Sequence, residues 1–80
     1  MPKLKSFSGA ELVKLFQSFG FEIIGKKGSH IKLRRIKSIT KETIVIPNHK
    51  IIDKGTAKAI LRQSSAFISI EELNKLFYSD

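Results

Sequence analysis

Three short runs of β-branched and aromatic residues follow one another in the middle of this chain, and they constrain its fold more than any other feature. The runs are FEIIG (21–25), HIKLRRI (30–36) and TIVIP (43–47). The second run alternates polar and apolar residues, as does a strand with one buried face. KKGS separates the first two runs as a turn, and KSITKE separates the last two as a longer polar connection. Consecutive strands joined in this way are expected to pair as an antiparallel meander.

An amphipathic helix is predicted before the strands, over residues 9–19. Ser8 and Glu11 have the spacing of a capping box, in which each residue satisfies a backbone amide of the other at a helix start. Gly20 suits the left-handed conformation that ends many helices. The apolar residues of this segment recur at helical spacing and belong to one face: Leu12, Leu15, Phe16 and Phe19.

Two helices are predicted after the strands, and they supply the layer that a small sheet needs on one face. The first follows Asp53, with an apolar stripe at Ala57, Ile60 and Leu61. Cations occur on another face of this helix at intervals of four residues: Lys54, Lys58 and Arg62. The second is short and begins at a further capping box, Ser69 to Glu72.

The predicted fold is therefore α+β with the order αβββα, in which helices cover one face of a three-stranded antiparallel sheet and a short helix is appended. With 80 residues, no repeat and no long linker, the chain is expected to form a single domain over residues 1–80.

The charge of the chain limits its partners. Fifteen Lys and Arg against seven Asp and Glu give a formal charge of +8, which attracts nucleic acid, an acidic protein or an anionic membrane surface. Cysteine is absent and the two histidines lack metal-ligand spacing, so we expect neither cofactor nor metal. No apolar run has the length of a signal peptide core or a membrane span, which predicts a cytoplasmic protein.

His30 is the candidate for chemistry. Alternation along its strand places Ile31 and Leu33 toward the helices, and it leaves His30, Lys32 and Arg34 on the open face. An imidazole has a pKa of roughly 6.5 in water, so its neutral, basic form is abundant at cellular pH. Such a base could remove the proton of an RNA 2′-hydroxyl while cations offset the charge that develops on the phosphate.

A simpler interpretation exists for each of these residues. A lone exposed histidine on a basic strand is most often a solvated residue, and cations on an amphipathic helix often serve only to keep that face in water. The cations after Asp53 are all of one sign and begin at a helix N-terminus, whose amides also attract phosphate. A role in binding nucleic acid is therefore about as well supported as simple solvation. The phenylalanines at apolar positions are expected in the core rather than under stacked bases.

The sequence resembles the HicA family of small toxins from toxin–antitoxin pairs. The resemblance is carried by KKGSHIKL (26–33), IVIPNH (44–49) and KGTAKAILRQS (54–64), and it covers nearly the whole chain. It implies a fold like the double-stranded RNA-binding domain, cleavage of mRNA without a metal, and neutralisation by a cognate HicB-type antitoxin. In that family the His of the Gly-Ser-His motif is catalytic, which corresponds to His30. Ile31 differs from the second His or aromatic residue that many members have there.

On this basis we predict a toxin endoribonuclease, an mRNA interferase, with His30 as general base. The residues expected to hold or shape the RNA are Lys26, Lys27, Gly28, Ser29, Lys32, Arg34, Lys54, Lys58 and Arg62. His49, at the Pro-x-His position of the family, is either the proton donor to the leaving oxygen or, as the commoner role, a residue that hydrogen-bonds the turn before the next helix.

Two other classes stay open: a noncatalytic double-stranded RNA-binding module, and a basic adaptor that docks an acidic protein. The base preference and the oligomeric state are not fixed by the sequence, and a toxin that is monomeric alone and multimeric with its antitoxin is one compatible arrangement.

Overall fold

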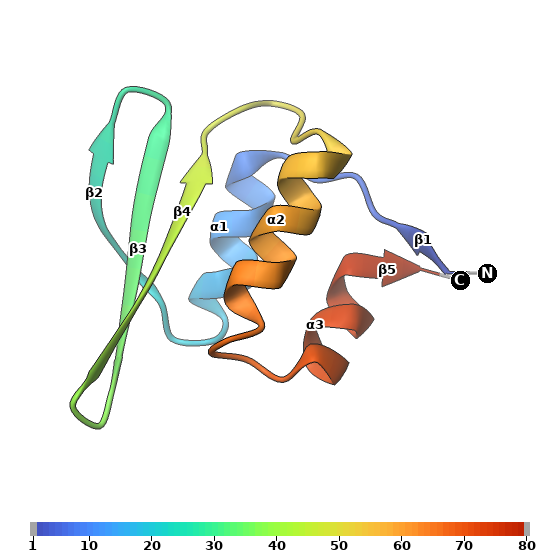
Figure 1. Cartoon of the computed structure of the whole chain (residues 1–80). Helices are drawn as coiled ribbons and strands as arrows, with labels where there is room; N and C mark the ends of the chain where they lie inside the picture. Colours follow the sequence, from blue (N-terminus) through green and yellow to red (C-terminus); the bar gives the residue numbers. More distant parts are fainter. Residues whose placement is uncertain (1, 80) are drawn as a thin grey trace.

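The three predicted strands form one antiparallel sheet in the order β2-β3-β4 in the computed structural model of the chain, which describes residues 2–79 (Figure 1). Their bounds are Glu22–Lys27 for β2, His30–Lys37 for β3 and Thr40–Pro47 for β4. The expected fold class, α+β with this sheet covered on one face by helices, is confirmed.

The predicted long connection between the second and third strands is wrong. Strands β3 and β4 continue to Lys37 and from Thr40, so that only Ser38 and Ile39 form the turn. Ser38 has a φ of 59°, the positive value that the first central residue of a tight hairpin turn requires. The end of this hairpin extends beyond the helices (Figure 1), so most of its polar residues pair as strand and stay exposed, whereas Glu42 is buried and accepts from Arg35.

The register of β3 and β4 places four apolar residues of the two strands on the helix-facing side, whereas Ile36 and Val45 lie on the open face. Ile31 pairs with Ile46, and Leu33 pairs with Ile44. All four of these paired side chains are buried. The alternation predicted for β3 is therefore confirmed. A shift of the pairing by one residue would have placed these apolar side chains on the open face.

The helices begin where their capping residues predict. Helix α1 spans Gly9–Gln17 and helix α2 spans Lys54–Ser64. At the start of α1 the amide of Ser8 donates to a carboxylate oxygen of Glu11 over 2.8 Å, and the amide of Glu11 donates to Ser8 Oγ over 3.0 Å. Helix α1 ends slightly before the expected Phe19, and Gly20 follows with a φ of 94°.

The third helix, α3, spans Ile70–Phe77 and packs beyond the other two. In Figure 1, α1 and α2 lie between the sheet and α3. The ring of Phe77 is buried, with its centroid 5.2 Å from that of Phe7 and 6.4 Å from that of Phe16. Full burial of each such side chain stabilises the fold by about 1.5–3 kcal/mol. Phe16, Phe19, Phe21 and Phe77 were expected in the core. Phe16, Phe21 and Phe77 are buried there, whereas Phe19 is only partly buried against it.

A two-stranded ribbon near the chain ends was not predicted. Strand β1 (Lys3–Leu4) pairs antiparallel with β5 (Tyr78–Ser79), and the amide of Lys5 donates to the carbonyl of Phe77 over 2.7 Å. Both strands are too short to leave an alternating pattern in the sequence. Within residues 2–79, no helix has the length and apolarity that crossing a membrane requires.

Arg35 joins several elements through one half-buried guanidinium. Its Nε donates to Glu42 over 2.6 Å, and its two terminal nitrogens donate to the carbonyls of Phe19, over 2.9 Å, and Phe67, over 3.1 Å. The guanidinium carbon also lies 4.9 Å from the centroid of the Phe21 ring. Arg35 thus ties the sheet to the end of α1 and to the segment between α2 and α3.

Candidate active site

His30 is the first residue of β3 and follows the tight turn from β2. The register pairs it with Lys27 on one side and Pro47 on the other, and its side chain is exposed. Gly28 has a φ of 59°, and Ser29 has no positive φ, which matches a two-residue turn with glycine at its first central position. The predicted position of His30 on the open face is thus the position found.

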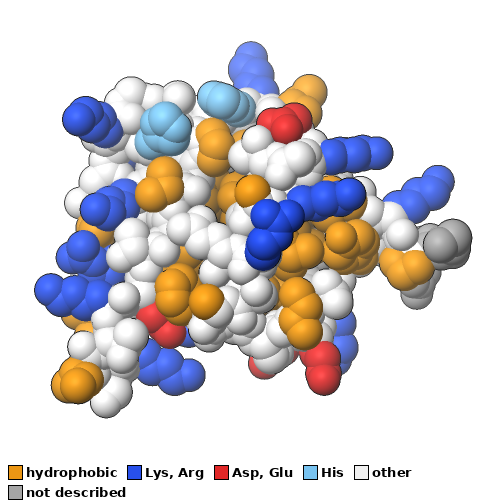
Figure 2. Space-filling model, viewed as in Figure 1, with side chains coloured by type: hydrophobic (Ala, Val, Ile, Leu, Met, Phe, Trp, Pro, Cys, Tyr) orange, Lys and Arg blue, Asp and Glu red, His pale blue; other side chains and the backbone are white. Residues whose placement is uncertain are grey.

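The segment after β4 lies against this turn. The amide of Asn48 donates to the carbonyl of Ser29 over 2.5 Å, and the amide of Gly9 donates to the carbonyl of His49 over 2.8 Å. These two bonds place the backbone of His49 at the same end of the sheet as His30, between the β2–β3 turn and the start of α1. Figure 2 shows histidine side chains near each other on that end of the molecule.

The cations predicted around His30 divide between the two faces of the sheet. Lys27 pairs with His30 itself, and Lys32 and Arg34 follow His30 at two-residue intervals along β3. Lys26 instead pairs with Ile31, so it belongs to the helix-facing side of the edge strand, where it remains exposed. Lys27, Lys32 and Arg34 therefore share a face with the imidazole, and Lys26 does not.

Arg34 is the one member of this group that is half-buried. It lies in the middle strand, between Glu22 of β2 and Thr43 of β4. Among residues 2–79, its Nε has no hydrogen-bond partner although it is shielded from solvent. A buried donor without a partner carries a cost that an acceptor on the open face would remove.

Lys54, Lys58 and Arg62 are exposed along α2, as their four-residue spacing predicts. Lys54 is the first residue of that helix and follows the loop that carries His49. Figure 2 shows lysine and arginine side chains both along the outer edge of the sheet and over the helical layer. The structure therefore presents two basic surfaces, one on the sheet and one on α2, which meet at the His49 loop.

The N-terminus of α2, whose amides were expected to attract phosphate, already has one of its amides bonded. Asp53 caps it, and its carboxylate accepts from the amide of Thr56 over 3.1 Å and from the Thr56 hydroxyl over 2.6 Å. These bonds lower the pKa of Asp53 below its usual value of 3.8. The ionised carboxylate of Asp53 takes up the Thr56 amide and adds a negative charge, so Lys54 and Lys58 would provide most of the attraction for phosphate here.

Two features of this end were not predicted from the sequence. Gly9 was assigned only to a helix start, yet a Cβ at that position would lie 2.2 Å from the carbonyl oxygen of Pro47. Asn48 was not singled out, although its amide joins the two loops. Only the tertiary contacts identify these residues, because a glycine or asparagine beside a turn is common in any sequence. Across the described part of the chain, no three His, Asp or Glu side chains gather as a metal site would require.

This fold and this surface define a class: a small basic α+β protein whose open antiparallel sheet presents an exposed imidazole among cations. The family model described as HicA toxin of bacterial toxin–antitoxin matches residues 9–65. The chain therefore belongs to the HicA toxin family, and this membership implies a cognate antitoxin as partner. Comparisons with curated proteins and with solved structures give no match.

Proposed function

We propose that the chain is a toxin endoribonuclease that cleaves single-stranded regions of mRNA without a metal, with His30 as the general base. One observation carries the proposal: an exposed imidazole shares the open face of the sheet with Lys27, Lys32 and Arg34. Cations that flank a base attract the phosphate next to the hydroxyl that the base must deprotonate. Membership in a toxin family is consistent with this activity.

The reaction needs one proton acceptor and one proton donor. His30 takes the proton of a 2′-hydroxyl, and the resulting oxygen attacks the adjacent phosphorus. The bond from phosphorus to the 5′-oxygen then breaks, and that oxygen receives a proton from an acid. The products are a 2′,3′-cyclic phosphate and a free 5′-hydroxyl. Lys27 and Lys32 flank His30 on the same face and would stabilise the charge that develops on the phosphate.

His49 is a candidate for the acid because its loop is fixed beside the β2–β3 turn. The bond from Asn48 to Ser29 and the bond from Gly9 to His49 hold that loop in place. Both use backbone atoms, so the exposed imidazole of His49 stays free to act on a substrate. A lysine or a water molecule is the alternative donor. Loss of the His49 side chain with retained cleavage would favour that alternative.

The remaining predicted residues have supporting roles in this proposal. Gly28 and Ser29 form the turn over which the RNA approaches, and the Ser29 hydroxyl can donate to a phosphate oxygen. Lys26, on the other side of β2, contributes to the field rather than to a contact beside His30. Lys54, Lys58 and Arg62 would follow the RNA backbone along α2.

The antitoxin that the family implies would inhibit by covering the same surface. An acidic partner placed over His30 competes with RNA for Lys27, Lys32 and Arg34, so that no conformational change of the toxin is needed. We propose a HicB-type antitoxin in this role.

The test is cleavage of a long, mixed-sequence RNA by the purified chain in excess EDTA, beside the His30→Ala and His49→Ala variants. We expect cuts with 2′,3′-cyclic phosphate ends from the wild type, and a loss of about 100-fold or more for His30→Ala, as for removal of a general base. Because His30 is exposed, its removal should change the free energy of unfolding by no more than about 0.5 kcal/mol, which circular dichroism checks.

Two results would contradict the proposal. Equal cleavage by wild type and a folded His30→Ala variant would remove His30 from the chemistry. Intact RNA with retained affinity for duplexes would instead identify a noncatalytic double-stranded RNA-binding module, whose αβββα order this chain shares.

A further inference from the structure

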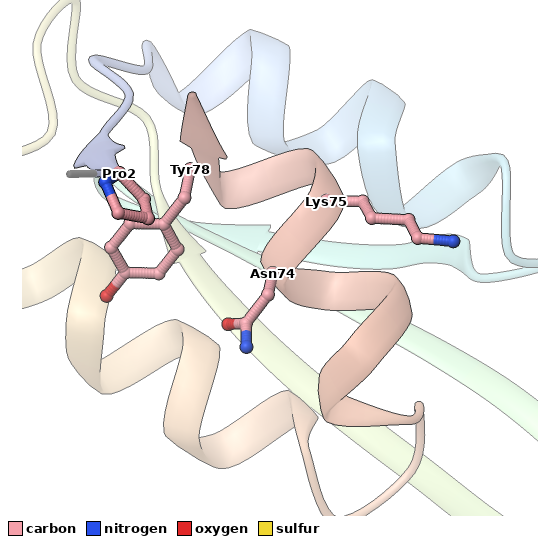
Figure 3. A pocket seen from close by; sticks show the side chains of 4 residues that line it. All are labelled: Pro2, Asn74, Lys75 and Tyr78. Atoms are coloured by element: carbon pink, nitrogen blue, oxygen red, sulfur yellow. The ribbon is translucent and has the colours of Figure 1, made fainter. Parts of the chain in front are cut away.

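A groove lies on the side of α2 that faces away from the sheet, built with residues beyond the matched segment 9–65. One depression, of about 640 Å³, is lined by Pro2, Asn74, Lys75 and Tyr78 (Figure 3). A second, of about 290 Å³, is lined by Lys58, Leu61, Arg62, Ser65, Ile70 and Tyr78. Tyr78 borders both depressions, so we treat them as one surface, the α2–α3 groove.

The α2–α3 groove is cationic and partly polar. Lys58 and Arg62 border it from α2, and Lys75 borders it from α3. The acidic residues of the first turn of α3, Glu71 and Glu72, do not line either depression. The groove therefore favours an anionic ligand.

The floor of the groove offers a ring and an amide. Tyr78 is half-buried, and Figure 3 shows its ring beside Pro2 with the hydroxyl on the side of α2. The side chain of Asn74 extends into the space next to that ring (Figure 3). An aromatic ring beside an amide with both donor and acceptor atoms is a pair that can hold a nucleobase by contact and by its hydrogen-bonding edge.

The geometry points to the α2–α3 groove as the binding site for a nucleotide of single-stranded RNA that flanks the cleaved bond. This inference rests on the proposed function. Lys58 and Arg62 belong both to the basic stripe of α2 and to the groove. From Lys54 to Arg62 the helix rises by about 12 Å, so a strand that follows the stripe from the His49 loop arrives at the groove. The base would then rest against Tyr78 with its edge toward Asn74.

The composition of the groove favours RNA over an acidic protein helix. Such a helix inserts a row of apolar anchors, spaced over two turns, into an apolar channel. Here Leu61 is buried, and the exposed apolar residues of the groove are Ile70, 48% exposed, and Pro2. Three cations and an amide around so small an apolar area match a nucleotide better.

The inference is tested by RNA affinity in a His30→Ala background, which prevents cleavage. Fluorescence anisotropy would be measured with single-stranded oligonucleotides of increasing length. We expect a step in affinity once the strand reaches the groove, and a loss of about fivefold from that step in Asn74→Ala, the effect of about one hydrogen bond. Lys75→Ala should weaken the same step, whereas Lys14→Ala, which removes an equal charge from an exposed site on α1, should not.

Cross-linking identifies the site directly. RNA with 4-thiouridine at successive positions should cross-link to the peptide that contains Asn74 and Tyr78 when the label flanks the cleaved position. A step that survives Asn74→Ala and Lys75→Ala, with cross-links from the β2–β3 turn alone, would overturn the inference and leave the ribonuclease proposal standing. An acidic polypeptide, poly-glutamate, whose binding depends on these residues while RNA binding does not would also overturn it. If neither the His30→Ala protein nor any of the variants made in it bound RNA, both this inference and the ribonuclease proposal would be overturned.

Discussion

Gly9 fixes the position of the His49 loop because it has no side chain. Its amide donates to the carbonyl of His49, and a Cβ here would approach the Pro47 carbonyl oxygen to 2.2 Å. The start of α1 and the loop after β4 can meet at this distance only with glycine. A helix-start residue thereby determines where the second imidazole of the chain lies.

Gly9→Ala is expected to lower the free energy of unfolding by about 1–3 kcal/mol, since overpacking forces the backbone apart. Helix propensity alone predicts the opposite sign, because alanine favours a helix over glycine. Urea denaturation measures the difference. Gly25→Ala is the control: its Cβ would meet no atom within 4 Å, so its stability should change little. Equal effects of the two substitutions would contradict the close approach at Gly9.

Glu42 is a buried acidic residue whose role depends on Arg35. Its carboxylate lies 2.6 Å from Arg35 Nε, with side-chain exposures of 16% for Arg35 and 9% for Glu42. The pair joins β3 to β4 while the same guanidinium also binds the carbonyls of Phe19 and Phe67. A charge held in this way is costly to leave without its partner.

Glu42→Ala should destabilise the protein by about 2–3 kcal/mol, less than a fully buried pair because Arg35 keeps some contact with water. Glu42→Gln should cost less, since it keeps an acceptor for Nε. Thermal unfolding compares both with Lys37→Ala, an exposed residue of β3. If Lys37→Ala were as destabilising as Glu42→Ala, the pair would contribute no more than a surface charge.

At the scale of elements, α2 combines a structural cap with a basic stripe. Asp53 holds its first turn through Thr56, and this contact lowers the pKa of Asp53 below 3.8. A group with a lowered pKa in the folded state stabilises it above the pKa of the unfolded state. That contribution is lost as the pH falls through the folded-state pKa.

Asp53→Ala should therefore lower Tm at neutral pH, and the difference from the wild type should shrink at pH values below 3.8. Asp53→Asn keeps a capping oxygen but has no carboxylate to titrate. The Tm of this variant should therefore not show the decrease that protonation of Asp53 causes in the wild type at low pH. Differential scanning calorimetry over a pH series measures both. A difference between wild type and Asp53→Ala that is constant from neutral to strongly acid pH would show that the charge of the cap is irrelevant.

At the scale of the whole molecule, the family match and the packed structure cover different segments. The match ends at residue 65, yet Ile68, Leu73 and Phe77 are buried in the same core as Phe16. The β1–β5 ribbon then joins the two ends of the chain. Residues outside the matched segment are thus part of the fold that supports the site.

A chain ending at Ser65 is expected to lose cooperative unfolding. Removal of Leu73 and Phe77 costs about 2–5 kcal/mol for each, which together approaches the whole stability of a small protein. Urea titration followed by circular dichroism measures this loss. Deletion of residues 79–80 alone is the control and should leave a cooperative transition. A cooperative transition in the chain of 65 residues would show that α3 is dispensable to the core.

Local signals in the sequence predicted most of the fold. The capping residues Ser8, Asp53 and Ser69 mark helix starts because their side chains bond amides three residues away, a contact that needs no distant partner. Alternation also predicted the face of His30, because neighbouring side chains of a strand point to opposite faces wherever that strand is paired. The β3–β4 turn was placed wrongly, since polar residues in an exposed hairpin resemble a loop, and the β1–β5 ribbon depends on a pairing across almost the full chain.

The sequence by itself determined the order of the three helices and of the strands β2, β3 and β4, the buried face of β3, and His30 as the residue to test, because each of these is encoded by spacing within a few residues. Its motifs also indicated the family. The tertiary structure alone decided that Lys27 rather than Lys26 shares a face with His30, and that His49 lies at the same end of the sheet as His30. These features depend on strand register, on one missing side chain at Gly9 and on bonds between loops far apart in the sequence. Contacts between distant segments arise only when the chain packs, and no local pattern records them.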